Sequence, residues 1–484
     1  MTINHFYTYK DAYDKGVQYI PENAAPREPN RRDPYDMTVA AFANTMSYIF
    51  HYLHHQCYML CVKDNVNTIY KLQPLITAPV YKKILKDAVK GLHNNKLLTQ
   101  YQRNYIKRTV SGPAEVRIMQ CIVKQLPSGP SSNSPLNPTE TTNEYITLLR
   151  DVNLPNGVFI MNLTDAVILR EDGTHPFPMV VGPNVSIGKY ADEKHIPIFS
   201  ISGQRGYLDI QIPNYDDIMI VLGTKSDIQF DKFVVAWKDK TVDRAVFRGG
   251  ASGCGYTPET NARIKLATMT SPLIDAGITV RGGKTIDSMS IKFDPKHGIG
   301  MMNTGIKPVP FMTMIDQSRH KYIIHVDGNV SAYRLVTTLA TGSLILRVMS
   351  EYTTWFDAII QEGKHYIPIK PDLSDLVEKI EWCRSHDKEC QTIAKNGKNA
   401  AEWALSRDNI VTVMQLFIWR SVLPSYKSTR KIALRRTVKV RVKAKVRSKS
   451  ASPERSSSPT KHNKTQKNTG GSIKAYQSQR ITDI

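Results

Sequence analysis

The sequence contains no hydrophobic run long enough to cross a membrane. None of its stretches approaches the roughly 18 consecutive apolar residues of a transmembrane helix. The first residues, MTINHFYTYKDAYDKG, lack the basic segment and apolar stretch of a secretory signal, and the last residues, ITDI, are not a retention signal. We therefore expect a cytoplasmic protein without a transmembrane segment.

Cysteine is also scarce. The six cysteines are too few for a disulfide scaffold and show no paired Cys-x-x-Cys spacing, so a reducing compartment is the simplest interpretation. Two of them stand near three histidines in one stretch with helical spacing of apolar residues, namely His51, His54, His55, Cys57 and Cys61. Because their spacing matches no standard zinc finger, a core helix rich in histidine and aromatic residues is favoured over a zinc site.

Acidic residues are fewer than basic ones, 43 against 65, which gives a formal net charge of +22. The excess is concentrated in residues 425–484, called here the basic tail, which holds 17 basic and two acidic residues and carries a charge of +15. A low-complexity segment of this kind is too charged to bury a core and is expected to be disordered when free. Its charge favours binding to nucleic acid or to an anionic surface.

Changes in composition divide the chain into segments. Short β-rich runs such as GVFIMNL, FVVAW, KYIIHVDG and GSLILRVM alternate with helical patterns, which is typical of a mostly parallel α/β sheet. Later, two amphipathic helices are predicted on either side of a turn at Asn396 and Gly397. The expected segments are a polar extension (1–35), a helical amino-terminal region (36–124), a breaker-rich linker (125–143), a first α/β lobe (144–238), a second α/β lobe (239–400), a closing helix (401–424) and the basic tail (425–484).

The segment KYIIHVDGNVSAYRL, residues 321–335, predicts an anion site. An apolar strand ends at 325–327, Gly328 allows a tight turn, and a helix is expected to begin within 329–334. The free N–H groups of a first helical turn attract anions, Ser331 adds a hydroxyl, and Arg334 can bind phosphate with two hydrogen bonds. The alternative is an ordinary connection between a strand and a helix.

A second joint of the same kind spans residues 244–266. Arg248 ends a predicted strand, and a helix is expected to start near Thr257 or Pro258. Between them lie the glycines Gly249, Gly250, Gly253 and Gly255, whose backbone can approach phosphate closely. The loop is neither a Walker A motif nor a dinucleotide-binding fingerprint. Arg263, inside the helix, either turns back to the same site or lies on a solvated helix face.

Two such joints in one sheet suggest that a nucleotide or a nucleotide-linked donor binds at the carboxyl edge of the strands. The chain contains no Asp-x-Asp, the motif with which many transferases hold a metal. Neutralisation of phosphate charge would then fall to Arg248, Arg263 and Arg334, which predicts a reaction without a metal or another cofactor. Asp165, at the end of the strand GVFIMNL, is the candidate acid–base group, although an aspartate in this position is more often a turn or cap residue.

The chain resembles glycosyltransferase family 90, the family of the capsule-associated proteins and of the Rumi-like protein O-glucosyl- and O-xylosyltransferases. The resemblance extends from about Tyr145 to Arg420. It is strongest over HVDGNVSAYRLVTTLATGSLILRV and over KHYIPIKPDLSDLVEKIEWCRSHDKECQTIAKNG. Further upstream, FRGG and IPIFSISGQRGYLDIQIP, the latter followed by an acidic pair, are similar to family segments as well.

This resemblance implies a GT-B-like architecture, in which two Rossmann-like lobes face a cleft. It also implies an inverting, metal-independent transfer from a UDP-sugar, with glucose or xylose as the expected sugar, to a hydroxyl of a protein or glycan. By position, Asp165 corresponds to the general base in the first lobe, and Gly250 and Arg263 to donor-contacting residues. The stretch that would wrap the nucleotide diphosphate is Asn329, Val330, Ser331, Ala332, Tyr333 and Arg334. With Arg248 and Gly249, these residues make up the expected donor site.

One residue departs from the family pattern. Many relatives have an arginine immediately before the catalytic aspartate, whereas this chain has Thr164. The animal members of the family are secretory proteins, whereas we expect a cytoplasmic location for this chain, so a cysteine-rich secreted acceptor is not expected. The expected location is compatible with a family member from a large DNA virus or from a microbe. For a viral member, association with the virion is an option. The alternative function is a transferase-like structural or nucleic-acid-associated protein that has lost its activity.

Overall fold

The computed structural model describes residues 4–22, 24, 34–74, 138–177, 184–223, 235–253, 255–280, 291–294, 298–301 and 305–422. Residues 75–124 of the predicted helical amino-terminal region, residues 125–137 of the predicted linker and the basic tail lie outside these residues. Every helix in the described ranges is too short or too polar to span a bilayer.

The first sheet has six strands in the order β1-β3-β2-β4-β5-β7. Strands β4, β5 and β7 run parallel, β2 is antiparallel to both β3 and β4, and β1 pairs in parallel with β3. All residues of β4 are buried, as expected for a central strand covered on both faces. The strands are β1 (Asn4–Phe6), β2 (Cys57–Lys63), β3 (Val66–Leu72), β4 (Gly157–Asn162), β5 (Ile198–Ser200) and β7 (Ile210–Gln211).

The hairpin β2–β3 corrects our prediction that residues 36–124 are helical. Helix α2 (Val39–Ser47) and the π-helical turn η2 (Tyr48–Leu53) end at His54, which has left-handed backbone with a φ of 49°. Asp64 and Asn65, both with positive φ, then form a two-residue hairpin turn. All of β2 except its last residue is buried, and an uninterrupted apolar run of this kind does not distinguish a buried strand from a helix.

The predicted polar extension is also part of the fold. Strand β1 forms one edge of the first sheet, and helix α1 (Tyr9–Gly16) follows it directly. The hydroxyl of Thr8 caps this helix by accepting a hydrogen bond from the N–H of Asp11 at 3.2 Å. The predicted polar extension therefore contributes a strand and a helix to the first lobe.

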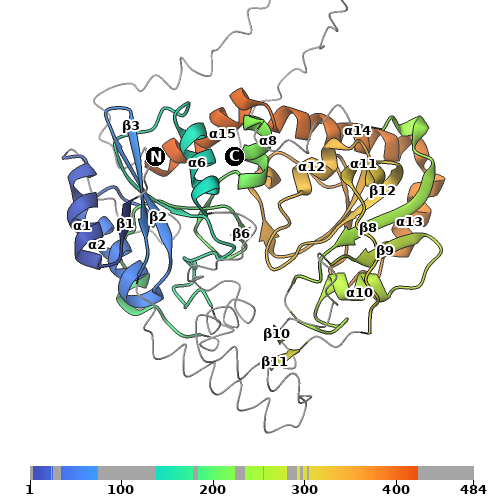
Figure 1. Ribbon diagram of the computed structural model, residues 1–484, viewed down its shortest axis with the longest axis horizontal. Coiled ribbons are helices and arrows are strands. Elements are labelled where there is room, and N and C mark those ends of the chain that lie inside the picture. The colour runs from blue at the N-terminus through green and yellow to red at the C-terminus, as the bar shows by residue number, and fades with distance from the viewer. Residues whose placement is uncertain are drawn as a thin grey trace, which may run out of the picture. The chain divides into compact units, whose positions relative to one another are not determined.

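The second sheet is entirely parallel and has the strand order β15-β13-β12-β8-β9. Its strands are β8 (Val242–Gly249), β9 (Ile274–Ile278), β12 (His320–His325), β13 (Leu344–Val348) and β15 (Ile367–Ile369). Helices α10 (Ala262–Thr268) and α12 (Leu335–Ala340) connect neighbouring strands, and Figure 1 shows α10 beside β9. The predicted fold class, α/β with two lobes built on largely parallel strands, is confirmed.

The helices at the end of the described chain connect the two lobes. Helix α13 (Leu376–Ser385) ends before His386, and α14 (Asp387–Ala404) is continuous, so the turn predicted at Asn396 and Gly397 is wrong. Position 397 lies inside α14 and requires glycine, because a Cβ atom there would stand 2.6 Å from the carbonyl oxygen of His365. The glycine is thus explained by close packing of the helix and not by a turn.

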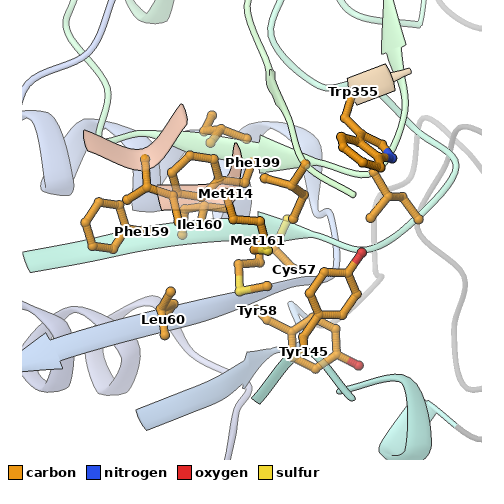
Figure 2. Packing of buried hydrophobic residues seen from close by; sticks show 14 of the residues in the cluster. Cys57, Tyr58, Leu60, Tyr145, Phe159, Ile160, Met161, Phe199, Trp355 and Met414 are labelled. Carbon is orange, nitrogen blue, oxygen red and sulfur yellow. The ribbon is translucent and has the colours of Figure 1, made fainter. Parts of the chain in front are cut away.

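Helix α15 (Arg407–Val422), within the predicted closing helix, packs on the first lobe. Arg407 forms an ion pair with Asp151 at 2.6 Å, and the indole N–H of Trp419 donates to the carbonyl of Asn153 at 2.6 Å. In Figure 2, Met414 of this helix lies among the apolar residues of β4 and β5. The carboxyl-terminal helix therefore completes the core of the first lobe.

Candidate active site

The loop after β4 carries Asp165, and a buried amide fixes its shape. Asn162, the last residue of β4, accepts hydrogen bonds from the backbone N–H and the hydroxyl of Thr164, at 3.3 and 2.7 Å. The amide nitrogen of Asn162 donates to the carbonyl of Ala166, and the hydroxyl of Thr164 accepts from the N–H of Ala166 at 3.2 Å. Thr164 therefore closes the turn that presents Asp165, which is the local role of the residue that departs from the family pattern.

Buried polar side chains next to this loop fix the orientation of the Asn162 amide. Burial raises the pKa of Asp209 to about 6, so its carboxylate is charged at neutral pH and accepts from the hydroxyl of Ser200 at 2.6 Å. Ser200 in turn accepts from the Asn162 amide nitrogen at 3.0 Å. His55, whose pKa burial lowers to about 4, is neutral and stands 3.1 Å from the Asn162 oxygen. The result is one connected network from Asp209 to Thr164.

In the second lobe, Asp327 organises the segment after β12. One of its oxygens accepts from the N–H of Ala332 at 2.7 Å, and the other accepts from the hydroxyl of Ser350 at 2.7 Å. Burial alone would raise the pKa of Asp327, but His325 and these hydrogen bonds hold it below its ordinary value. Gly328 leaves room for the Ser252 hydroxyl, which would have to shift because a Cβ atom at this position would stand 2.8 Å from it.

Two guanidinium groups face the same aromatic ring below this segment. Arg263 and Arg334 lie 5.8 and 5.4 Å from the centre of the Phe247 ring. Burial, together with the charge of Arg334, lowers the pKa of Arg263 to about 9, and burial lowers that of Arg334 to about 10. Within the residues that the structure describes, neither forms an ion pair with a carboxylate. The pair thus creates a local excess of positive charge.

Hydrogen bonds fix the position of both groups. Arg263 donates to the Ser252 hydroxyl at 2.7 Å and to the carbonyls of Gly250, Val326 and Asp327 at 3.1, 2.8 and 2.9 Å. Arg334 donates to the carbonyl of Arg248 at 2.6 Å. Arg263 is 8% exposed, so the alternative in which it lies on a solvated helix face is wrong. Backbone carbonyls are neutral, and the nearby charge of Asp327 only partly offsets the effect of burial on the pKa of Arg263.

A cavity of about 310 Å³ brings these parts together. Its lining contains every residue predicted for the site except Arg248. Asp165 reaches it from the first lobe, and the hydroxyl of Tyr333 in the second lobe donates to Asp165 Oδ1 at 2.8 Å. The lining residues are Asp165, Asp216, Gly249, Gly250, Ser252, Arg263, Gly328, Asn329, Val330, Ser331, Ala332, Tyr333 and Arg334.

The structure does not bring Arg248 to this cavity. Its guanidinium forms an ion pair with Asp275 on the neighbouring strand β9 at 2.7 Å and donates to the carbonyl of the same residue at 2.8 Å. Only its backbone carbonyl, which accepts from Arg334, contributes to the site. The predicted role of the Arg248 side chain in donor binding is therefore not supported by its position.

The two helix starts also differ from our prediction. Helix α12 begins at Leu335 and not within 329–334, and α10 begins at Ala262 and not near Thr257. Residues 329–334 are held in a loop because Asp327 accepts from the N–H of Ala332. The groups offered to an anion are therefore loop backbone and arginine side chains, and not the N-terminus of a long helix.

Sequence reasoning did not select Asp216 or Ser252 as site residues. Asp216 lies in the first turn of α8 (Tyr215–Leu222), where an acidic side chain is common because it stabilises the helix N-terminus. Its only sequence signal is the acidic pair after the IPIFSISGQRGYLDIQIP segment. The cavity consequently holds two carboxylates, Asp165 and Asp216.

A second cavity, of about 570 Å³, adjoins the first and shares Gly328 with it. Val326 and Asp327 after β12 and the stretch 348–352 after β13 line one part of it, and Arg170, Gln204 and Tyr207 of the first lobe line another.

The structure gives His55, Cys57 and Cys61, three of the residues weighed as a zinc site, other contacts. His55 faces Asn162, and Cys57 and Cys61 are buried thiols on β2. Among the described residues, no three histidine, cysteine, aspartate or glutamate side chains are grouped as metal ligands would be.

Comparison with known proteins identifies a family and several relatives. Residues 178–474 match the model of glycosyl transferase family 90. The chain is 33% identical over 316 residues to "Uncharacterized protein 035R" of Invertebrate iridescent virus 3. This alignment covers 61% of this chain and 27% of that protein. It is 31% identical over 271 residues to "Protein O-glucosyltransferase 2" of Danio rerio, covering 55% of this chain and 47% of that protein.

Among solved structures, Anabaena Alr3699/HepE in complex with UDP-glucose is similar with a TM-score of 0.30 and 12% identity, over 70% of this chain and 94% of that chain. The chain spans between about a quarter and a half of the length of the two curated relatives above. Asp165 precedes the range that the family model matches.

Proposed function

The chain belongs to glycosyl transferase family 90, and from this premise we propose that it transfers a sugar from a UDP-sugar to a hydroxyl of a protein or glycan acceptor. Glucose and xylose are the proposed sugars, and the name of the Danio rerio relative supports glucose. Inversion at the sugar carbon and independence from metal are parts of the same proposal.

One observation carries this proposal: a single cavity is lined by two carboxylates, Asp165 and Asp216, and by two guanidinium groups, Arg263 and Arg334, that form no ion pair with a carboxylate in the described part of the chain. A diphosphate is the kind of ligand that such a pair of charges attracts, because charge-assisted hydrogen bonds to phosphate are strong in a partly dry site. The glycine-rich backbone at 249–250 and the loop 328–334 complete the surface that faces it. This arrangement supports a nucleotide diphosphate as leaving group.

In the proposed reaction, Asp165 accepts the proton of the acceptor hydroxyl. The acceptor oxygen attacks the anomeric carbon from the face opposite UDP, a new carbon–oxygen bond forms, and the bond between the sugar and the diphosphate breaks. The electron pair of that bond leaves with UDP, whose growing negative charge Arg263 and Arg334 stabilise. Because these two cations perform the role that a metal performs in other transferases, the proposal includes none.

The test is UDP release by the purified chain from UDP-glucose and UDP-xylose, with water or a sugar hydroxyl as acceptor, in EDTA. We expect release to persist in EDTA. Asp165→Asn should lower turnover by about 10²- to 10⁴-fold, the usual contribution of a general base, and leave UDP binding nearly unchanged.

Asp216→Asn is the matched comparison, since it removes the other carboxylate of the same cavity. A larger loss in Asp216→Asn than in Asp165→Asn would reassign the base to Asp216. A strict requirement for Mn²⁺ or Mg²⁺ would count against the proposed mechanism, and no UDP release from either donor would reject transfer of these sugars.

A further inference from the structure

We infer that Tyr333 is a positioning residue for the base: its hydroxyl holds the Asp165 carboxylate and joins it to the loop 328–334 that faces the donor. This inference rests on the proposed function, because it assigns Tyr333 a task only if Asp165 accepts the proton. It concerns the orientation of the base and adds no new reacting group.

The contact joins two parts of the chain that are far apart in sequence. The Tyr333 hydroxyl donates to Asp165 Oδ1 at 2.8 Å, from the segment between β12 and α12 to the loop after β4. A second bond from the same segment runs in parallel, since the Ser331 hydroxyl donates to the Ser202 hydroxyl at 3.2 Å, and both serines are buried. The donor-facing loop is therefore bonded to the first lobe at two points, at Asp165 after β4 and at Ser202 after β5.

Tyr333 can act only as a hydrogen-bond donor to Asp165. Burial and the adjacent charge of Asp165 raise the pKa of Tyr333 well above its ordinary value, so its hydroxyl stays protonated in the working range. Its ring packs edge-on against that of Tyr215, with 5.5 Å between the ring centres. Because the ring is held in place, the hydroxyl has a fixed direction.

This geometry determines which carboxylate oxygen is left for the acceptor. Oδ1 is occupied by the tyrosine, and no hydrogen bond to Oδ2 is present in the described part of the chain. Since the loop of Asp165 is itself closed by Asn162 and Thr164, the Tyr333 bond fixes the remaining freedom, the rotation of the carboxylate. Oδ2 is then directed to one position, where the acceptor hydroxyl must lie.

The same bond makes the orientation of the base depend on the donor loop. Tyr333 stands immediately before Arg334, whose guanidinium is one of the two proposed to hold the diphosphate. A donor that binds to the loop 328–334 and fixes its conformation therefore also fixes the position of the Tyr333 hydroxyl. Through the hydrogen bond to Oδ1, it then fixes the orientation of the Asp165 carboxylate. Productive orientation of the base is expected only when this loop is in the arrangement described above.

The experiment removes the hydroxyl and keeps the ring, with Tyr333→Phe. UDP release from UDP-glucose and UDP-xylose is measured with wild type, Tyr333→Phe, Asp165→Asn and the double variant, and UDP binding is measured by calorimetry. Tyr322→Phe is the matched control, because Tyr322 is buried on β12 and its hydroxyl has no hydrogen-bond partner among the described residues. Equal thermal unfolding midpoints of Tyr333→Phe and Tyr322→Phe would show that both fold.

We expect turnover of Tyr333→Phe to fall about tenfold or more, the effect of losing a hydrogen bond to a charged group, while its UDP affinity and the turnover of Tyr322→Phe stay within about twofold of wild type. In the Asp165→Asn background the same substitution should change the residual rate by less than about twofold, because a residue that acts through Asp165 has no effect once the base is gone. A purely structural role would lower both backgrounds equally.

Three results would overturn the inference. Wild-type turnover in Tyr333→Phe, with Asp165→Asn inactive, would reject the role of Tyr333 and leave the proposed function intact. An equal loss in both backgrounds would assign Tyr333 to folding or to donor binding. No UDP release by the wild type would reject the proposed function, and the inference with it.

Discussion

Replacing Arg334 by alanine removes one of two guanidinium groups from the proposed diphosphate site. The Arg334 guanidinium donates a hydrogen bond to the carbonyl of Arg248 at 2.6 Å and lies over the Phe247 ring. Its other N–H groups have no hydrogen-bond partner among the described residues, so they are available to a phosphate. A hydrogen bond from a charged group contributes about 1.5–3 kcal/mol, so we expect UDP affinity to fall by about 10- to 150-fold in Arg334→Ala.

Arg248→Ala provides a control with the same change in charge and a different place in the fold. The Arg248 guanidinium is paired with Asp275, and its backbone carbonyl, which orients Arg334, survives the substitution. UDP affinity should therefore stay within about threefold of wild type, whereas the free energy of unfolding should fall because Asp275 loses its partner.

Calorimetric titration with UDP in buffer of constant ionic strength measures both affinities, and urea unfolding measures both stabilities. Unchanged UDP affinity in Arg334→Ala would reject the anion site. An equally large loss of affinity in Arg248→Ala would show that net charge, and not the position of the guanidinium, governs binding, and it would refute the reasoning from geometry.

Two further predictions concern stability and the basic tail. Burial lowers the pKa of His55 and His195 to about 4, below the value of about 6.5 for an unfolded histidine, so the unfolded chain binds more protons between these two pH values. The free energy of unfolding should fall as pH decreases through this window, by up to about 1.4 kcal/mol per pH unit for each histidine, and equal urea midpoints at pH 7 and pH 5 would contradict this. Deleting the basic tail should leave UDP binding unchanged and weaken retention on heparin and on DNA, with the difference shrinking as salt rises; identical elution of the full and truncated chains would reject a polyanion-binding tail.

The second lobe shows what local pattern can predict. The strand that ends at His325 and the presence of Arg263 and Arg334 at one site follow from apolar runs and charge in sequence order. The helix start was misplaced because Asp327 accepts from the N–H of Ala332 and keeps the segment in a loop. Glycine and serine patterns do not reveal which backbone group a buried carboxylate will cap.

Long-range pairing explains the other errors. Arg248 and Arg334 carry the same charge at similar joints, and only the neighbouring strand β9, with Asp275, separates their roles. In the same way, β2 reads as an apolar run, and its identity as a strand depends on β3 and β4 on either side. In both examples, the ion-pair partner or the neighbouring strand that determines the role of the residue comes from another part of the chain. The local spacing of residues does not show such partners.

Thr164 is, with the basic tail, one of two sequence features in favour of a transferase-like protein without activity, and its contacts weaken that argument. Its hydroxyl donates to Asn162 and accepts from Ala166, so it closes the turn on which Asp165 stands. An arginine at this position would place a cation beside the acceptor, but the carboxylate itself reaches the cavity without one. The substitution therefore bears on which acceptor binds beside Asp165, and a loss of proton transfer does not follow from it. Retention of turnover in Thr164→Ser, which keeps both hydrogen bonds, and loss in Thr164→Val, which removes them at the same volume, would separate this turn-closing role from a role in acceptor contact.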